Sequence, residues 1–301
     1  MRKSDGCLGR DVRSSHAQWF ALCATLLFAG CGLNEPAREP HLRPADAPDF
    51  VVIGVSGHSI EPINYNPEYL GAQGTLDVYR DVILSSGHSV RTGRFADNLE
   101  TYVFTETGEV AAYGFLDLLE TLRNINAEWI ADFDNPTRII VVAHSHGTVW
   151  AHTALHVLEQ EGTPMPVEFL VDIDAVSTGW ETHYLGVGDE WGTEIPAYSA
   201  AHGLTWPFAI ENAEDSWPIP GRTWLQDVED VVPTSVATNL EIWSNDFTFI
   251  HDSESNHRLD GSTSNIFFSM SGVNHESTDE PYSDAVLWSS NFIRARLQSG
   301  I

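Results

Sequence analysis

The chain has 301 residues, of which 42% are hydrophobic and 11% aromatic, enough to bury a substantial core in one large domain or two small ones. This composition excludes a disordered or fibrous chain. The 43 Asp and Glu residues against 15 Lys and Arg give a formal net charge of −28, which leaves too few cations for a contiguous phosphate-binding surface. We therefore expect no nucleic-acid partner.

The N-terminus has the pattern of an export signal rather than of a folded segment. Basic residues precede an apolar run from Trp19 to Ala29, which is too short to span a bilayer but has the length of the apolar region of a secretory signal. The run ends in Leu27-Phe28-Ala29-Gly30-Cys31, a sequence that resembles the lipobox of bacterial lipoproteins.

That resemblance implies where the mature protein begins and where it resides. Residues 1–30 would be removed as a signal peptide, and Cys31 would be diacylated and become the new N-terminus. Gly32, rather than Asp, after this cysteine implies the outer membrane in a cell that has two membranes. We expect an exported protein held at the bacterial cell envelope by an N-terminal lipid anchor, with simple secretion as the alternative.

Residues 31–48 have the composition of a tether between the anchor and a folded body. They carry four prolines, which favour an extended chain. Cys7 and Cys23 fall within the signal peptide, so the domain formed by residues 49–301 contains no cysteine and must be stabilised by its core.

Apolar runs alternate with helix-period segments along this domain. The runs predict buried strands at Phe50–Val55, Arg138–Ala143, Val167–Ile173, Leu240–Trp243 and Ile266–Met270, with a further strand at Ser89–Phe95. The helix-period segments predict helices at Leu76–Leu84, Ala112–Phe133, His146–Gln160 and Ser283–Leu297. Strands separated by helices imply crossover connections, so the expected fold class is α/β, with a mostly parallel central sheet and helices on both faces.

The pentapeptide Ala143-His144-Ser145-His146-Gly147 stands between a predicted strand and a predicted helix. A nucleophile elbow requires this context, because small residues two places before and after the serine let the strand and helix backbones approach. The segment resembles the alanine variant of G-x-S-x-G found in some lipases of the α/β-hydrolase superfamily. Ser145 is therefore the candidate nucleophile.

The resemblance also implies a base and an orienting acid, which follow the serine in the chain in the order acid, histidine. His275 follows the last predicted strand and precedes the last helix, where the superfamily places its catalytic histidine. Asp174 follows the strand after the nucleophile and resembles the acid of pancreatic-type lipases. Asp246, just past the fourth strand, occupies the more usual superfamily position and is the alternative acid, with Asp252 a third choice.

The oxyanion of the reaction requires preorganised backbone donors. One is expected to be the amide of His146, at the start of the helix that follows the nucleophile, where the helix dipole favours negative charge. The second is expected from the loop Ser56-Gly57-His58 after the first strand, with the His58 amide preferred over that of Gly57.

A competing metal chemistry begins with the same segment. His144-x-His146 resembles the start of the H-x-H-x-D-H motif of metallo-β-lactamase-like hydrolases, and His152 and His156 lie at helical i, i+4 spacing. Thr148 and Val149 occupy the Asp-His positions of that motif, so the match fails. We expect neither a metal nor another cofactor.

Residues 177–238 interrupt the alternation of strands and helices and carry five tryptophans. A connection of this length is usually functional or an insertion with its own structure, and in this superfamily caps and lids occur here. We expect an α/β-hydrolase fold with a cap-like insertion, acting as an esterase or lipase on a small-molecule or lipid ester through an acyl-enzyme. An amidase or peptidase with the same triad, and a non-catalytic surface binding protein on a hydrolase scaffold, are the alternatives.

Overall fold

The computed structural model describes residues 38–57, 67–97, 102–104, 110–176, 217–218, 225–226, 228–245 and 255–300. The predicted signal peptide and Cys31 lie outside these residues, as do His58, Asp246, Asp252 and most of the predicted insertion. No helix in the described part of the chain is long and apolar enough to cross a bilayer. The elements below all belong to the unit that begins at His41.

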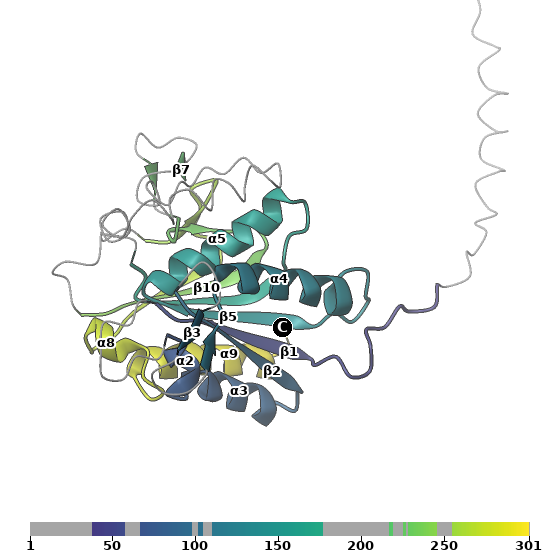
Figure 1. Cartoon of the computed structure of the whole chain (residues 1–301), viewed down its shortest axis with the longest axis horizontal. Helices are drawn as coiled ribbons and strands as arrows, with labels where there is room; N and C mark the ends of the chain where they lie inside the picture. Colours follow the sequence, from purple (N-terminus) through teal and green to yellow (C-terminus); the bar gives the residue numbers. More distant parts are fainter. Residues whose placement is uncertain are drawn as a thin grey trace, which may run out of the picture. The chain divides into compact units, whose positions relative to one another are not determined.

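Six parallel strands form the central sheet (Figure 1). They are β1 (Phe50–Val55), β2 (Val90–Phe95), β5 (Arg138–His144), β6 (Val167–Ile173), β10 (Val236–Trp243) and β12 (Ile266–Met270). Their order across the sheet is β12-β10-β6-β5-β1-β2, and each neighbouring pair is parallel. The predicted fold class is confirmed by this arrangement.

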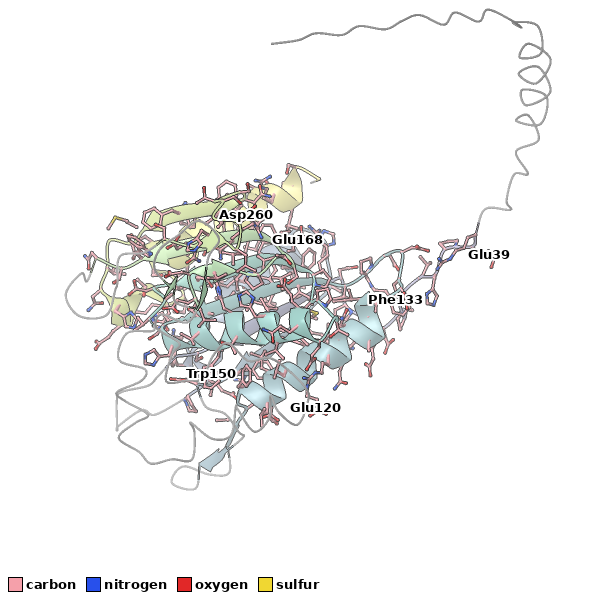
Figure 2. The ribbon with its side chains drawn as sticks, turned by 90° about the horizontal axis from the view of Figure 1, so that it is seen from above. Glu39, Glu120, Phe133, Trp150, Glu168 and Asp260 are labelled. Atoms are coloured by element: carbon pink, nitrogen blue, oxygen red, sulfur yellow. The ribbon has the colours of Figure 1, made fainter. Side chains whose placement is uncertain are left out.

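Helices cover both faces of the sheet (Figure 1). On one face lie α4 (Phe115–Ile125) and α5 (His146–Gln160), and on the other lie α3 (Thr75–Ser85) and α9 (Asp284–Gln298). Figure 2 shows α4 and α5 side by side over their face, where the Phe115 and Trp150 rings lie 4.9 Å apart. Alternate residues of β1 enter the two cores, so the β-branched run that predicted a buried strand is buried on both sides.

The predicted helix at Ala112–Phe133 is wrong at both ends. Ala112 belongs to β4 (Val110–Ala112), which pairs antiparallel with β3 (Tyr102–Phe104). Gly114 is extended and its amide donates to the Asp117 carboxylate, which starts the helix at Phe115. After Ile125 the helix widens into one π-helical turn, η1 (Asn126–Ile130).

β10 begins at Val236, four residues before the predicted start of this strand at Leu240 and inside the range 177–238. Within residues 177–238, β7 (Trp217–Pro218) pairs with β8 (Leu225–Gln226). In the same range, β9 (Val231–Val232) pairs in parallel with β11 (His257–Arg258), a strand that follows β10 in the chain. Two short helices were not predicted, α2 (Tyr69–Ala72) and α8 (His275–Thr278), and both lie beside the site described next.

Candidate active site

Three strand ends bring the candidate residues together. Ser145 follows β5, Asp174 follows β6, and His275 follows β12 at the start of α8. Because all strands of the sheet run parallel, their carboxyl ends lie along one edge, which is where open α/β sheets place their sites. Residues far apart in the sequence therefore meet at this edge.

Ser145 occupies a strained turn between β5 and α5. Its φ is 56° and its ψ −135°, a backbone conformation that non-glycine residues rarely adopt. Its amide donates to the carbonyl of Ile173 on the neighbouring strand at 3.1 Å. At Gly147 a Cβ would lie 2.2 Å from the carbonyl oxygen of Val55, so only glycine fits where the helix crosses β1. The local geometry is thus a tight strand–turn–helix corner with Ser145 at its apex.

The hydroxyl of Ser145 lies 3.0 Å from Nε2 of His275, and Nδ1 of His275 lies 2.5 Å from Oδ2 of Asp174. Asp174 is 1% exposed and its carboxylate can only accept, so the imidazole carries its proton on Nδ1. Nε2 then has its lone pair directed at the serine hydroxyl, as a general base requires. The structure thus brings Ser145, His275 and Asp174 into one hydrogen-bonded chain.

Two further hydrogen bonds fix Asp174, one to its carboxylate and one from its backbone amide. Its other oxygen, Oδ1, accepts from the amide of Ser244 at 2.5 Å, and its own amide donates to the carbonyl of Ile242. Both partners lie at the end of β10, which pairs with β6. The backbone of Asp174 has a φ of 48°, so the strand alternation stops at Ile173 and the side chain turns toward His275.

Asp172, in β6 two residues before Asp174, faces different partners. Its Oδ2 lies 3.1 Å from Nε2 of His152 on α5 and accepts from the side-chain amides of Asn239 and Asn256. It is fully buried beneath α5, and none of these contacts is with Ser145 or His275. The two neighbouring carboxylates therefore belong to separate networks, one in the core and one at the site.

The loop after β1 lies against Ser145. A Cβ on Gly57 would lie 2.6 Å both from Cβ of Ser145 and from the carbonyl oxygen of His144. The amide of Gly57 donates to the hydroxyl of Tyr69 on α2 at 2.8 Å, so this amide is engaged elsewhere. The amide of His146 is the first in α5, next to Ser145, whereas His58 lies outside the described residues.

The four histidines of the metal alternative are not assembled into a site. His144 hydrogen-bonds Tyr69 and the carbonyl of His275, while Nδ1 of His146 lies 3.7 Å from Asp97. His152 and His156 both approach the carbonyl of Val231. Among the described residues, no group of three or more His, Cys, Asp or Glu side chains is placed to hold a metal ion.

Three contacts at the candidate site could not be predicted from the sequence. Tyr69, Ser244 and Thr278 contact His144, Asp174 and His275 respectively. Each belongs to a short helix or loop without hydrophobic periodicity, and two of the three contacts use a backbone atom. No pattern in the sequence distinguishes these positions.

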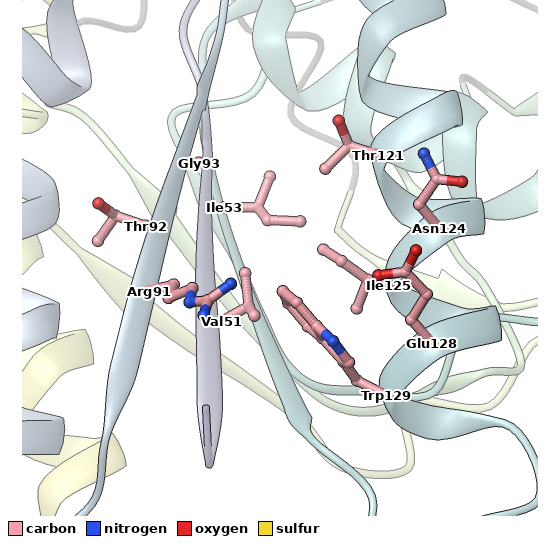
Figure 3. Close-up of a pocket in the computed structure, with 10 residues that line it drawn as sticks. All are labelled: Val51, Ile53, Arg91, Thr92, Gly93, Thr121, Asn124, Ile125, Glu128 and Trp129. Carbon is pink, nitrogen blue, oxygen red and sulfur yellow. The ribbon is translucent and has the colours of Figure 1, made fainter. Parts of the chain in front are cut away.

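A separate cavity of about 270 Å³ lies between β2 and α4 (Figure 3). Figure 3 shows Trp129 of η1 and Ile125 of α4 facing Val51 and Ile53, and the guanidinium of Arg91 lies 5.0 Å from the Trp129 ring centre. None of the candidate triad residues lines this cavity. It is thus distinct from the site at the strand ends.

No family model and no curated protein matches this sequence. The structure is similar to fungal esterases from Rhizomucor miehei, with a TM-score of 0.41 and 12% identity over 88% of this chain and 77% of the other. It is also similar to the thermophilic carboxylesterase EstE1 from a metagenomic library, with a TM-score of 0.40 and 14% identity over 87% and 82%. A hormone-sensitive lipase from a metagenome library gives a TM-score of 0.40 and 12% identity over 86% and 81%. At these values the function rests on the geometry of the site and not on the likeness.

Proposed function

We propose that the protein is a serine hydrolase that cleaves carboxylic esters through an acyl-enzyme on Ser145. The observation that carries the proposal is the continuous chain from Asp174 through His275 to the Ser145 hydroxyl. A serine hydroxyl is a weak nucleophile unless an adjacent base takes its proton, and the base must itself be oriented. Asp174 and His275 meet both requirements by contact.

The reaction follows from these contacts. Oγ of Ser145 attacks the ester carbonyl carbon while its proton passes to Nε2 of His275, which gives a tetrahedral oxyanion and an imidazolium. The imidazolium, stabilised by Asp174, protonates the leaving alcohol as the carbon–oxygen bond breaks. Water then attacks the acyl-enzyme, with His275 as the base, and releases the acid and the serine. No step requires a cofactor.

The amides of His146 and His58 are the proposed donors to the oxyanion. The His146 amide begins α5, so it lies at the positive end of the helix dipole and beside the attacking oxygen. Gly57 supports the choice of His58 indirectly, because its own amide is bonded to Tyr69. Loss of one such donor typically slows turnover about 100- to 1,000-fold.

A fluorophosphonate probe tests whether the serine is activated. We expect the wild-type protein to be labelled and the Ser145→Ala variant to be neither labelled nor active. The backbone conformation at Ser145 comes from the turn, so circular dichroism and the thermal midpoint should show that the variant folds. A folded Ser145→Ala variant that keeps most of its activity would overturn the mechanism.

The same assay separates the remaining alternatives. Hydrolysis of a p-nitrophenyl ester series, faster than that of peptide amides, supports the esterase; the reverse order would identify an amidase or peptidase. A wild-type protein that the probe does not label would instead be a binding protein on this scaffold.

We also propose that the protein is exported and anchored to the cell envelope through a lipid on Cys31. The support is the run of residues from Trp19 to Cys31. Labelled palmitate should be incorporated into the full-length protein in bacteria and be lost in a Cys31→Ala variant. Equal labelling of both proteins would contradict the anchor.

A further inference from the structure

His144, which directly precedes the proposed nucleophile, is enclosed against the proposed base. Its side chain is 5% exposed. Its ring stacks on that of His275, with the ring centres 4.8 Å apart and the planes inclined by 29°. Its Nε2 lies 3.1 Å from the backbone carbonyl oxygen of His275, and its Nδ1 lies 2.6 Å from the hydroxyl of Tyr69.

The partners of His144 determine which ring nitrogen carries the proton. A carbonyl oxygen can only accept, so Nε2 must donate to His275. Nδ1 then carries the lone pair and accepts from the Tyr69 hydroxyl, whose oxygen in turn accepts from the amide of Gly57. Burial raises the pKa of the Tyr69 hydroxyl well above its ordinary value, so the hydroxyl keeps its proton and can donate.

The ring of His144 is held in its neutral form. Burial lowers its pKa, and the neighbouring His275 lowers it further, although the carboxylates of Asp279 and Asp174 act in the opposite direction. Asp279, whose Oδ2 lies 3.9 Å from Nδ1 of His144, itself accepts from the side-chain amide of Gln73. Thr278 completes the surroundings by donating to the same carbonyl of His275.

These contacts form one continuous chain of hydrogen bonds, in which each residue donates to the next. Gly57 donates to Tyr69, Tyr69 donates to His144, and His144 donates to His275. The first residue lies in the loop after β1, against the nucleophile, and the last carries the base. His144 thus links the loop expected to bind the oxyanion to the residue expected to transfer the proton.

We propose that His144 is a positioning residue. Through the chain Gly57–Tyr69–His144–His275, it holds the His275 imidazole and the loop after β1 in fixed positions relative to each other. The inference rests on the proposed function, because positioning matters only if His275 acts on Ser145. His144 touches no substrate in this role. Its effect on rate comes through the orientation of His275 and Gly57.

Two variants interrupt the chain while keeping the volume of the core. Tyr69→Phe removes the donor to Nδ1, and His144→Phe keeps a ring against His275 but removes both hydrogen bonds. With p-nitrophenyl butyrate and the purified full-length protein, each should lower kcat about 10- to 100-fold with little change in KM, as a small displacement of a catalytic group does. The double variant should lose no more than the worse single one, because both cut one chain.

Tyr79→Phe is the matched control. Tyr79 is a buried tyrosine whose hydroxyl bonds Ser289, between α3 and α9, away from the site. The Tyr79→Phe variant loses one buried hydroxyl, as Tyr69→Phe does, and should keep the wild-type kcat and the wild-type dependence of kcat on pH.

His144→Gln should have a higher kcat than His144→Phe, because the Gln side-chain amide can still donate to the carbonyl of His275.

Nuclear magnetic resonance of protein labelled with ¹⁵N-histidine tests the positioning without activity. His144 should show a proton on Nε2 and none on Nδ1 at neutral pH, and the Nδ1 proton of His275 should exchange faster in Tyr69→Phe than in Tyr79→Phe. A proton on Nδ1 of His144, or folded variants with wild-type kcat and pH profile, would overturn the inference. Failure of the proposed function would appear already in the wild type, whereas failure of this inference appears only in the variants.

Discussion

Oδ2 of Asp174 lies 2.5 Å from Nδ1 of His275, although 101 residues separate the two in the chain. The sheet explains their meeting: β6, β10 and β12 are consecutive neighbours, and the residues follow the first and the last of the three. Ser244, at the end of the middle strand, donates its amide to the same carboxylate. The position of the Asp174 carboxylate is therefore set by strand order, and a backbone donor holds it.

Asp174→Asn should keep the fold and lose most of the activity. An amide at this position presents an N–H or a weaker acceptor to Nδ1, which favours the wrong tautomer of His275, and the comparable change in the template triad lowers turnover about 10⁴-fold. The measurement is kcat for ester hydrolysis beside the thermal midpoint of unfolding. Asp246→Asn is the comparison, and a larger loss there than in Asp174→Asn would assign the acid to Asp246.

Chelation should leave ester hydrolysis unchanged. The ring nitrogens of His144 and His152, and Nε2 of His156, already face hydrogen-bond partners, so these side chains cannot turn to a common ion without breaking buried contacts. Activity measured before and after dialysis against EDTA checks this expectation. A loss that zinc restores, with no recovery on adding calcium or magnesium, would favour the metal alternative.

Gly147→Ala should destabilise the protein although it adds one methyl group. The new Cβ would lie 2.2 Å from the carbonyl oxygen of Val55, and backbone atoms of β1 and α5 would have to separate. Overpacking of this kind typically costs about 1–3 kcal/mol. Urea unfolding measures the change, with Gly162→Ala as a control, because there the added Cβ meets no atom within 4 Å and only the positive φ is strained. An equal loss in both variants would contradict the close approach.

The turn that holds Ser145 could be predicted because it stands next to strong patterns. Ser145 follows a buried β-branched run, and Gly147 marks a close crossing of strand and helix, so both strand end and turn are visible in the sequence. His275 follows the last predicted strand, Ile266–Met270, which is only partly buried in the structure. The parallel order of the strands then determines which ends lie side by side.

The supporting contacts could not be predicted, because they depend on single hydrogen bonds rather than on periodicity. The positive φ of 48° at Asp174, which turns its side chain away from the alternation of β6, has no signal in the sequence. Tyr69 reaches His144 from a helix of four residues, too short to give a pattern.

His156 should make the protein less stable as the pH falls below about 6.5. Burial, together with the nearby His152, lowers its pKa to about 4, so between these values the unfolded chain binds a proton that the folded protein does not. Stability must then fall with decreasing pH, by at most about 1.4 kcal/mol per pH unit for one proton. His152 acts in the opposite sense. Burial lowers the pKa of His152 but Asp172 raises it more, so the pKa is higher in the folded protein than in the unfolded chain. The stabilisation from protonated His152 is therefore complete below the pKa of the unfolded chain and is lost as the pH rises through the pKa of the folded protein.

His156→Gln isolates the first effect. The Gln side chain can still donate to the carbonyl of Val231, the bond that Nε2 of His156 makes, but it cannot be protonated. The free energy of unfolding in urea, measured at intervals between about pH 4 and 7, should therefore decline less steeply toward acid in the variant than in the wild type, while the two proteins differ little at pH 7. Because the folded protein excludes the proton only if His156 stays neutral and buried, equal slopes in this range would show that the histidine is charged in the folded state and would contradict the burial described for it.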